Sequence, residues 1–269
     1  MSTTTLLVLG LGVAAIAAVR STWSPCGWSM LSTITPLTER GRGHRHAVTG
    51  TWFLLGALLG GAALGGLGAL GALVGGSRDL GAAWAGGIVA VAALGGAALD
   101  SDVVRPALPH HRRQVDEQWL DRFRPWVYGV GFGAQIGFGL ATYIMTAGVY
   151  LVILLGALTG SPGSALAMGL VFGLVRGSAV FASARCTSFE RLTAFHRAFA
   201  DLATPVRLIT ISCLVAAATL AGSVTWGAVG GVACLAVGAL WLVLAIRSGV
   251  DHISLPEARR AETRRPVAA

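Results

Sequence analysis

A short polar stretch interrupts the apolar N-terminal part of this 269-residue chain. It contains Ser24, Pro25 and Cys26, and Arg20 lies four residues before Ser24. Serine is a preferred N-cap and proline is favoured at the first helical position, so the pattern predicts a helix with Cys26 at its second position. Unpaired N–H groups and the positive dipole end of a helix favour the thiolate form of a cysteine. We therefore expect a reactive thiol, to which Arg20 adds positive charge.

A simpler interpretation of the same residues is that Pro25 only kinks a helix. Cys26 would then be a small buried residue without a chemical role. An arginine within an apolar segment is energetically costly and commonly marks a functional site in membrane proteins. Arg20 therefore favours a functional cavity at this position.

The composition shows what kind of protein must position these residues. Hydrophobic residues make up 54 % of the chain, charged residues 12 %, and the mean hydropathy is +0.71. A soluble domain carries about 25 % charged residues. Four cysteines in a long apolar chain also exclude a disulfide scaffold or a disordered protein. The chain is an all-α, polytopic membrane helix bundle.

The apolar runs give the number of membrane crossings. A crossing helix needs about 20 apolar residues. Runs of suitable length lie at 47–75, 80–99, 162–184, 204–222 and 226–246. Segments 4–37 and 126–159 are longer and interrupted, so we interpret each as one broken span, with two short helices apiece as the alternative. The count predicts about seven crossings.

The arginines orient this topology. The chain has 20 arginines and no lysine, for a formal net charge of +8. Nearly all lie in the first, third and fifth connections and in the C-terminal tail, which the positive-inside rule places in the cytoplasm. We expect a multi-pass protein of a bacterial plasma membrane with its N-terminus outside and its C-terminus cytoplasmic. The charge is spread between apolar runs, so we expect the lipid bilayer, and no nucleic acid, as its partner.

The order of a broken span followed by two spans occurs twice. The expected parts are a first repeat at 1–99, a cytoplasmic connection at 100–125, a second repeat at 126–222, an extra span at 223–247 and an Arg-rich cytoplasmic tail at 248–269. An odd number of spans per repeat inverts the second copy, and paired broken helices in inverted repeats frame a site near the middle of the membrane. Gln135, Thr142 and Tyr143, in the second broken span, would shape that site together with Arg20.

Ser24-Pro25-Cys26 in a broken first helix and the Gly-rich approach to Thr142 resemble the CcdA/DsbD transmembrane family, the cytochrome c biogenesis protein transmembrane region. The resemblance implies a thiol–disulfide electron conduit that takes reducing equivalents from a thioredoxin-like redox protein. Family members use two cysteines, one per broken helix. The second would fall near Thr142 or Tyr143, and neither is a cysteine. What carries over is Ser24, Pro25 and Cys26.

Two other functions are compatible with this sequence. A small-solute or ion transporter on the same scaffold would use Arg20, Gln135 and nearby serines and threonines as ligands. A non-catalytic subunit of a membrane complex would pack its partners through Gly-rich helices. Tolerance of Cys26→Ser separates these two functions from a thiol conduit.

The remaining polar residues provide weaker candidates. Cys186, at the expected cytoplasmic end of a span, is the alternative disulfide partner for Cys26. Arg176 is expected to snorkel or to pair with a polar residue such as Gln135. The histidines stand among arginines without tetrahedral ligand spacing, so we expect no metal and no cofactor.

Overall fold

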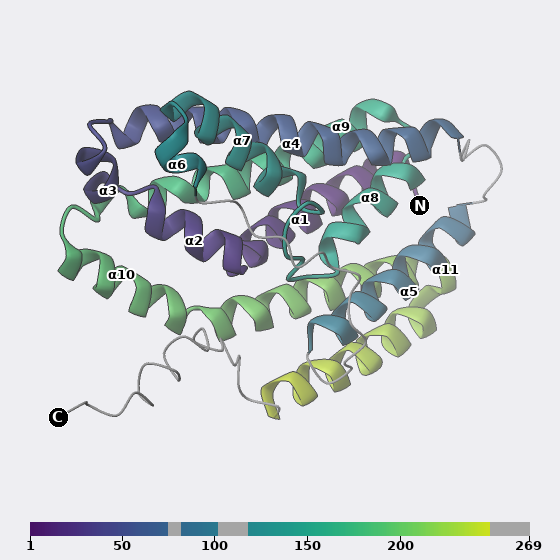
Figure 1. Cartoon of the computed structure of the whole chain (residues 1–269). Helices are drawn as coiled ribbons and strands as arrows, with labels where there is room; N and C mark the ends of the chain where they lie inside the picture. The colour runs from purple at the N-terminus through teal and green to yellow at the C-terminus, as the bar shows by residue number, and fades with distance from the viewer. Residues whose placement is uncertain (75–81, 102–117, 248–269) are drawn as a thin grey trace.

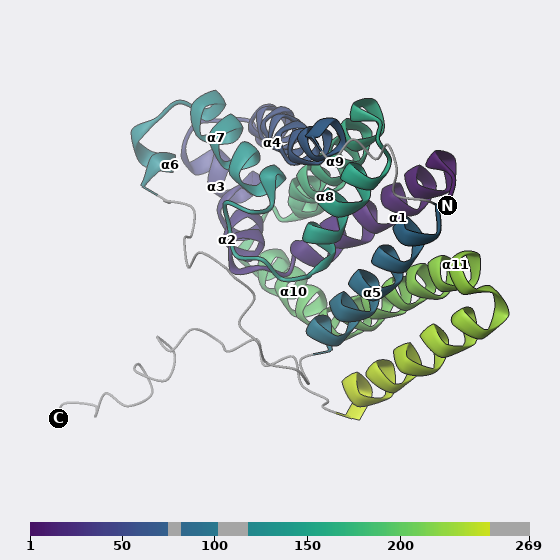
Figure 2. The same ribbon diagram turned by 90° about the vertical axis from the view of Figure 1, so that its right-hand side faces the viewer.

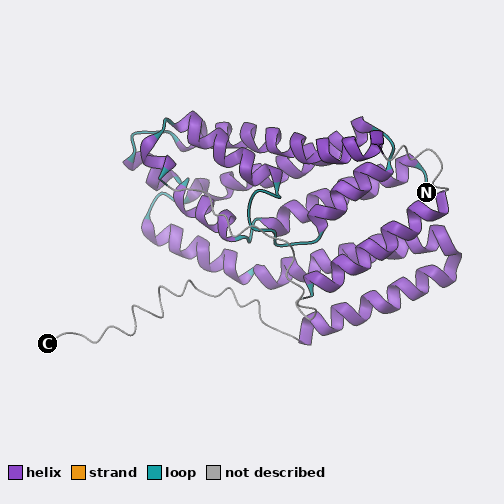
Figure 3. Ribbon diagram, turned by 45° about the vertical axis from the view of Figure 1, so that its right-hand side comes forward, coloured by secondary structure: helices purple, strands orange, loops and turns teal. Residues whose placement is uncertain are grey.

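The computed structural model describes residues 1–74, 82–101 and 118–247. These residues form helices joined by turns and loops, and none of them lies in a strand (Figure 3). In chain order the helices are α1 (Thr3–Ser21), α2 (Pro25–Thr33), α3 (Pro36–Gly41), α4 (His46–Val74), α5 (Ala82–Asp100), α6 (Trp119–Arg122), α7 (Pro125–Phe138), α8 (Gly148–Leu158), α9 (Pro162–Ser178), the 3-10 helix η1 (Ala179–Arg185), α10 (Phe189–Asp201) and α11 (Ala203–Arg247). The all-helical class predicted from the sequence is confirmed for the described residues.

Several helices begin at residues whose type fixes the start. Ser161 caps α9, with its side chain accepting a hydrogen bond from the backbone N–H of Ser164, and Pro162 follows at the first helical position. Thr35 and Thr38 form a reciprocal capping box at the start of α3. A hydroxyl acceptor satisfies an N–H group that the first turn leaves unpaired, and proline has no N–H to lose there. These starts are therefore local consequences of the sequence.

The helices lie roughly side by side along one direction, with α1 between two groups (Figure 1). On one side α4 packs against α7, α8 and α9. On the other side α5 packs against α11. Helix α1 contacts α8, α9 and α11, so the N-terminal helix joins the two groups. The polar stretch after α1 thereby lies inside the bundle.

The contact between α4 and α9 depends on small residues from both helices. A Cβ at Gly61 would clash with the carbonyl oxygen of Gly169, and a Cβ at Gly169 would clash with that of Gly61. Gly173 likewise has no room for a Cβ beside the carbonyl of Ala57. Small residues permit such close backbone approach in membranes. The four-residue glycine spacing in the sequence thus corresponds to a close helix crossing.

Helix α11 consists of two arms. Trp226 and Gly227 have non-helical backbone angles, with φ of 67° at Gly227. The chain reverses there, and the arms 203–226 and 227–247 run side by side in opposite directions (Figure 2). The Arg207 Nη2 donates to the carbonyl of Ala245 at 3.1 Å, which ties the two arms together. These arms correspond to the two apolar runs found in the sequence.

Both long segments are broken where the sequence predicts an interruption. In the first, α1 ends at Ser21 and α2 begins at Pro25. In the second, α7 ends at Phe138 and α8 begins at Gly148, with irregular chain between them. Gly139, at the start of that break, has a φ of 73°, which favours glycine. The α1–α2 break is short and the α7–α8 break is longer.

Four described helical segments are long and apolar enough to cross a membrane. They are Thr3–Ser21, His46–Val74, Pro162–Arg185 and Phe189–Arg247, and shorter apolar helices occupy Trp84–Asp100 and Gly148–Leu158. The chain is thus a helical membrane protein, while seven crossings and the orientation of the termini stay predictions. Most of the expected connection 100–125 and the expected tail 248–269 lie outside the described residues.

Candidate functional site

The break between α1 and α2 has the capped geometry that the sequence predicts. Ser24 is extended, with φ −72° and ψ 157°, and its Oγ accepts a hydrogen bond from the Gly27 N–H at 3.2 Å. Pro25 takes the first helical position, so Cys26 takes the second. Cys26 is 1 % exposed. The thiol is thus buried in the first turn of a helix, where unpaired N–H groups and the helix dipole attract negative charge.

Glycine at position 27 permits the close fold of this turn. A Cβ on Gly27 would clash with the carbonyl oxygen of Thr22, in the break itself. Trp23 and Ser24 each donate a backbone hydrogen bond back into α1, to the carbonyls of Arg20 and Ser21. The break is therefore a compact, hydrogen-bonded turn, which fixes the start of α2 relative to α1.

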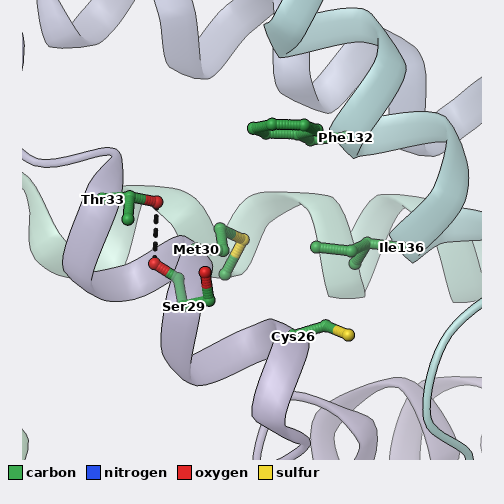
Figure 4. Close-up of a pocket in the computed structure, with 6 residues that line it drawn as sticks. All are labelled: Cys26, Ser29, Met30, Thr33, Phe132 and Ile136. Atoms are coloured by element: carbon green, nitrogen blue, oxygen red, sulfur yellow. Dashed lines mark hydrogen bonds between the residues drawn. The ribbon is translucent and has the colours of Figure 1, made fainter. Parts of the chain in front are cut away.

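Cys26 lines a small pocket between α2 and α7 (Figure 4). Ser29, Met30 and Thr33 extend the pocket along one face of α2, and Phe132 and Ile136 face them from α7. The pocket has a volume of about 210 Å³, including the open space at its mouth. The Thr33 hydroxyl donates to the Ser29 carbonyl at 2.8 Å, and Met30, Phe132 and Ile136 supply the apolar part of the walls. Cys26 is thereby positioned at one end of a narrow apolar groove.

The break also receives a buried cation from α9. The Nη2 of Arg176 donates to the Ser21 carbonyl at 3.2 Å and to the Ser24 Oγ at 3.3 Å. Arg176 is 1 % exposed, and its guanidinium lies over the Phe172 ring, 5.8 Å from the centroid. Because the side chain is buried, the expectation that Arg176 snorkels is wrong, whereas pairing with a polar residue is confirmed, with Ser24 as the partner in place of Gln135. The break itself offers the acceptors, because a buried guanidinium must find oxygen atoms nearby.

The other residues predicted for the site occupy different places. Arg20 is buried in the last turn of α1. Gln135 is partly buried on α7, next to the pocket residue Ile136. Thr142 and Tyr143 lie in the break between α7 and α8, where Thr142 is buried and its hydroxyl has no hydrogen-bond partner among the described residues. The structure therefore joins Ser24, Pro25 and Cys26 to Arg176, a contact that the sequence pattern did not indicate.

Helix α10 supports the first break from the side opposite the pocket. The Trp23 indole stacks on Phe199 with ring centroids 4.2 Å apart, and its Nε1 donates to the Phe199 carbonyl at 2.8 Å. Trp28 lies edge-on to the same ring at 5.0 Å. The Ser32 hydroxyl is 3.2 Å from Nε2 of His196. Helix α2 is thus held between α7 and α10, which restricts movement of Cys26.

The second break is stabilised by a carboxylate from α5. The Asp100 Oδ1 accepts the Ala147 N–H at 2.9 Å, and its Oδ2 accepts the Thr146 hydroxyl. The Thr146 Oγ1 also accepts the Gly148 N–H at 3.0 Å. A negative charge at a helix N-terminus is favourable. The start of α8 therefore holds its own buried carboxylate, whereas the residue that caps α2 is contacted by a buried cation.

A second buried carboxylate fastens the end of the bundle beyond α2. Glu39 is fully buried and accepts hydrogen bonds from the hydroxyls of Tyr128, at 2.9 Å to Oε2, and Thr49. Arg42 forms an ion pair with Glu39 at 3.3 Å and also donates to the Thr33 carbonyl at 3.0 Å. These contacts join α3 to α4 and α7. They fix the end of α2 that lies farthest from Cys26.

Within segments 1–74, 82–101 and 118–247, the remaining chemistry-bearing residues form no second centre. None of the four cysteines, all of which lie in described segments, forms a disulfide, so the expected alternative pairing of Cys26 with Cys186 is not present. Burial raises the pKa of the Cys186 thiol above its ordinary value of 9.0. Among the described residues no group of three or more His, Cys, Asp or Glu side chains is placed to hold a metal ion.

Comparisons with known proteins give a consistent set of relatives. The methylamine utilization protein MauF of Paracoccus versutus is 35 % identical over 179 residues, which cover 63 % of this chain and 63 % of that protein. MauF of Paracoccus denitrificans is 35 % identical over 176 residues, covering 62 % and 60 % of the two chains, and MauF of Methylophilus methylotrophus is 31 % identical over 167 residues, covering 61 % and 58 %. The chain therefore spans less than two thirds of the length of these relatives. No protein-family model matches the chain, and no solved structure matches it significantly.

Proposed function

We propose that this chain is an accessory membrane protein of methylamine utilization that carries out thiol–disulfide exchange through Cys26. The observation that carries the proposal is the placement of Cys26 in the first turn of α2, capped by Ser24, which itself accepts a hydrogen bond from Arg176. The MauF relatives supply the physiological context through their name, methylamine utilization protein. Their name does not refer to cytochrome c biogenesis.

The exchange needs only one cysteine in this chain. The Cys26 thiolate attacks one sulfur of a partner disulfide, forming a mixed disulfide, and the other partner sulfur leaves and takes up a proton. A thiolate of a thioredoxin-like dithiol then attacks one sulfur of the mixed disulfide, either that of the partner or that of Cys26, so that the S–S bond breaks and the other sulfur leaves as a thiolate. The second sulfur of the dithiol attacks the first, which closes the disulfide of the dithiol and releases the sulfur that was still bound to it. Two electrons and two protons pass from the dithiol to the disulfide, and Cys26 is regenerated.

The membrane scaffold that we propose is of the CcdA/DsbD type. The proposal is supported by the order of the helices, in which each of the broken segments α1–α2 and α7–α8 is followed by apolar helices, a pattern that is typical of inverted repeats. Counting α11 as two arms and each broken segment as one crossing gives seven crossings, with the N-terminus outside and the C-terminus in the cytoplasm. In this arrangement Cys26 and Arg176 lie within the bundle, and Cys26 lines the groove along α2.

A non-catalytic subunit of a membrane complex is the second candidate. It is favoured by the outward face of the second α11 arm, where Val229 is 80 % exposed and Val232 is 66 % exposed. Lipid covers such a face equally well, so the thiol chemistry separates the two candidates. A complex subunit tolerates Cys26→Ser, whereas an exchange protein does not.

The test is to trap the mixed disulfide in membranes. Cells grown on methylamine are quenched with acid and alkylated, and the tagged chain is run on non-reducing gels. We expect an adduct that dithiothreitol removes and that Cys26→Ser abolishes, together with loss of growth on methylamine. Cys213→Ser is the matched control, because Cys213 is exposed on the outer face of α11.

Two results would overturn the proposal. One is normal growth of the Cys26→Ser strain on methylamine with the variant present at the wild-type level. The other is an adduct that persists in Cys26→Ser and disappears in Cys213→Ser. Either result assigns Cys26 to packing and leaves the complex subunit or the small-solute transporter as the function.

A further inference from the structure

Arg176 has more hydrogen-bonding capacity than the break between α1 and α2 uses. A guanidinium carries five N–H donors and keeps its charge in proteins. The two hydrogen bonds of Arg176, to the Ser21 carbonyl and the Ser24 hydroxyl, both come from Nη2. Within segments 1–74, 82–101 and 118–247, nothing accepts a hydrogen bond from Nε or Nη1, although both atoms are buried. The donors on these two nitrogen atoms therefore have no acceptor among the described residues.

The two oxygen atoms that bind Arg176 have no capacity left for the remaining donors. The Ser21 carbonyl accepts the backbone N–H of Ser24 at 3.2 Å in addition to Arg176. The Ser24 Oγ accepts the backbone N–H of Gly27 at 3.2 Å in addition to Arg176. An oxygen atom of either kind offers two lone pairs. A further acceptor for Arg176 must therefore come from another group.

A second polar side chain at the same break also lacks a partner. Ser21 is 1 % exposed, and its hydroxyl forms no hydrogen bond within the described part of the chain. Ser21 is also the residue whose carbonyl accepts a hydrogen bond from Arg176. A buried hydroxyl and buried cationic donors without partners thus belong to two residues that are in direct contact.

No carboxylate compensates the charge of Arg176. Among the described residues, Arg176 forms no ion pair with an acidic side chain. The buried carboxylates Glu39 and Asp100 are engaged in other networks, at α3 and at the start of α8. The Phe172 ring, 5.8 Å from the guanidinium, stabilises a cation only weakly. A buried charge needs a partner of opposite sign, and the described protein does not supply one here.

We propose that the break between α1 and α2 binds a small monovalent anion, of the size of a halide, against Arg176 and the Ser21 hydroxyl. An anion accepts hydrogen bonds from the remaining donors and also balances the buried charge, whereas water would satisfy donors without balancing the charge. A cation is repelled by the guanidinium. Arg176 and Ser21 are each 1 % exposed, so the ion must be small. The positive end of the α2 dipole, which starts at this break, adds to the attraction.

This anion site is distinct from the groove that contains Cys26. The residues that line the groove come from α2 and α7, and neither Arg176 nor Ser21 is among them (Figure 4). The anion is held by the guanidinium from α9 and by the last residue of α1. The inference therefore goes beyond the proposed thiol exchange and does not depend on it.

The first test measures the melting temperature of the purified full chain in detergent, with chloride replaced by gluconate at constant ionic strength. Gluconate is too large for a buried site. We expect chloride to raise the melting temperature saturably, by about 3–6 °C at a concentration about ten times its dissociation constant. Arg176→Gln should lose this dependence. Arg185→Gln is the matched control and should keep it, because Arg185 is exposed at the end of η1 and removes the same charge from the surface.

A milder variant provides the same test if Arg176→Gln does not fold. Ser21→Ala removes only the hydroxyl, and we expect it to raise the half-saturating chloride concentration about tenfold or more, since it removes a hydrogen bond to a charged group. Cys26→Ser should leave the chloride dependence unchanged. Loss of thiol exchange and loss of anion binding are therefore separate outcomes, each with its own variants.

The second test locates the ion directly. Crystals of the full chain grown in bromide should show an anomalous scattering peak beside Arg176 and Ser21. Any of three results would overturn the inference: equal melting temperatures of the wild type in chloride and gluconate, a chloride dependence that persists in Arg176→Gln, or water in place of bromide beside Arg176. An ion that appears in the crystal without any effect of chloride on the melting temperature is adventitious and counts as the first of these results.

Discussion

Ser24 is the residue at which the cap of α2 and the buried cation meet, so its removal has a calculable effect. Ser24→Ala removes the acceptor for the Gly27 N–H and one acceptor for Arg176, in a site that is fully buried. Loss of an N-cap costs about 1 kcal/mol. Loss of a hydrogen bond to a charged group costs about 1.5–3 kcal/mol. The variant should therefore lose about 2.5–4 kcal/mol of stability.

Thermal unfolding in detergent, followed by circular dichroism, measures this loss. A change of 1 kcal/mol shifts the melting temperature by about 2–4 °C in a protein of this size, so Ser24→Ala should lower it by about 5–15 °C. Ser161→Ala is the matched control, because Ser161 caps α9 through Ser164 and has no hydrogen bond to an arginine of the described residues. The control should lose only the cap, which corresponds to about 2–4 °C.

Equal shifts in Ser24→Ala and Ser161→Ala would refute this reasoning. Such a result would mean that Arg176 gains nothing from Ser24 and that the polar contact across the bundle does not stabilise the break. A large shift in both variants would instead show that N-caps contribute more to the stability of this protein than the usual value of about 1 kcal/mol. Only a clear difference between the two variants supports the role given to Arg176.

Three further predictions concern other parts of the bundle. Gly169→Leu should prevent stable packing of α4 on α9, because even a Cβ clashes with the Gly61 carbonyl, and we expect loss of the monodisperse species in size-exclusion chromatography. Gly66→Leu is the control and should behave as wild type, because a Cβ at Gly66 meets open space. Asp100→Asn should lower the melting temperature by about 2–8 °C, since it removes the negative charge at the start of α8; an unchanged value would contradict the capping role. Alkylation of Cys186 in native membranes should be slow at neutral pH and rise only above pH 9, because burial raises the pKa of this thiol and keeps it protonated below that value. Denatured protein should react at lower pH, and equal pH profiles in the two states would be inconsistent with a buried thiol.

The sequence predicted the elements well, because apolar run length and capping residues act locally. The runs 47–75 and 162–184 correspond to α4 and to α9 with η1, and the start of α2 at Pro25 follows from Ser24 and Pro25 alone. Both interruptions of the long segments were also predictable, since polar residues or clustered glycines stand there. The four-residue spacing of Gly61 and Gly65 and of Gly169 and Gly173 is visible in the sequence, and the structure shows that these glycines meet where α4 packs on α9.

The tertiary structure decided which polar groups meet. Arg176 and Ser24 are separated by 152 residues, and their contact depends on how α9 packs beside α1, which no local pattern encodes. The same holds for Asp100, whose carboxylate reaches the start of α8 from the end of α5. The sequence by itself determined that the chain is a helical membrane protein and that a thiol lies at a capped helix start. Only packing supplied the buried cation beside that helix start, because a charge in a low-dielectric interior acts on whichever groups the fold places next to it.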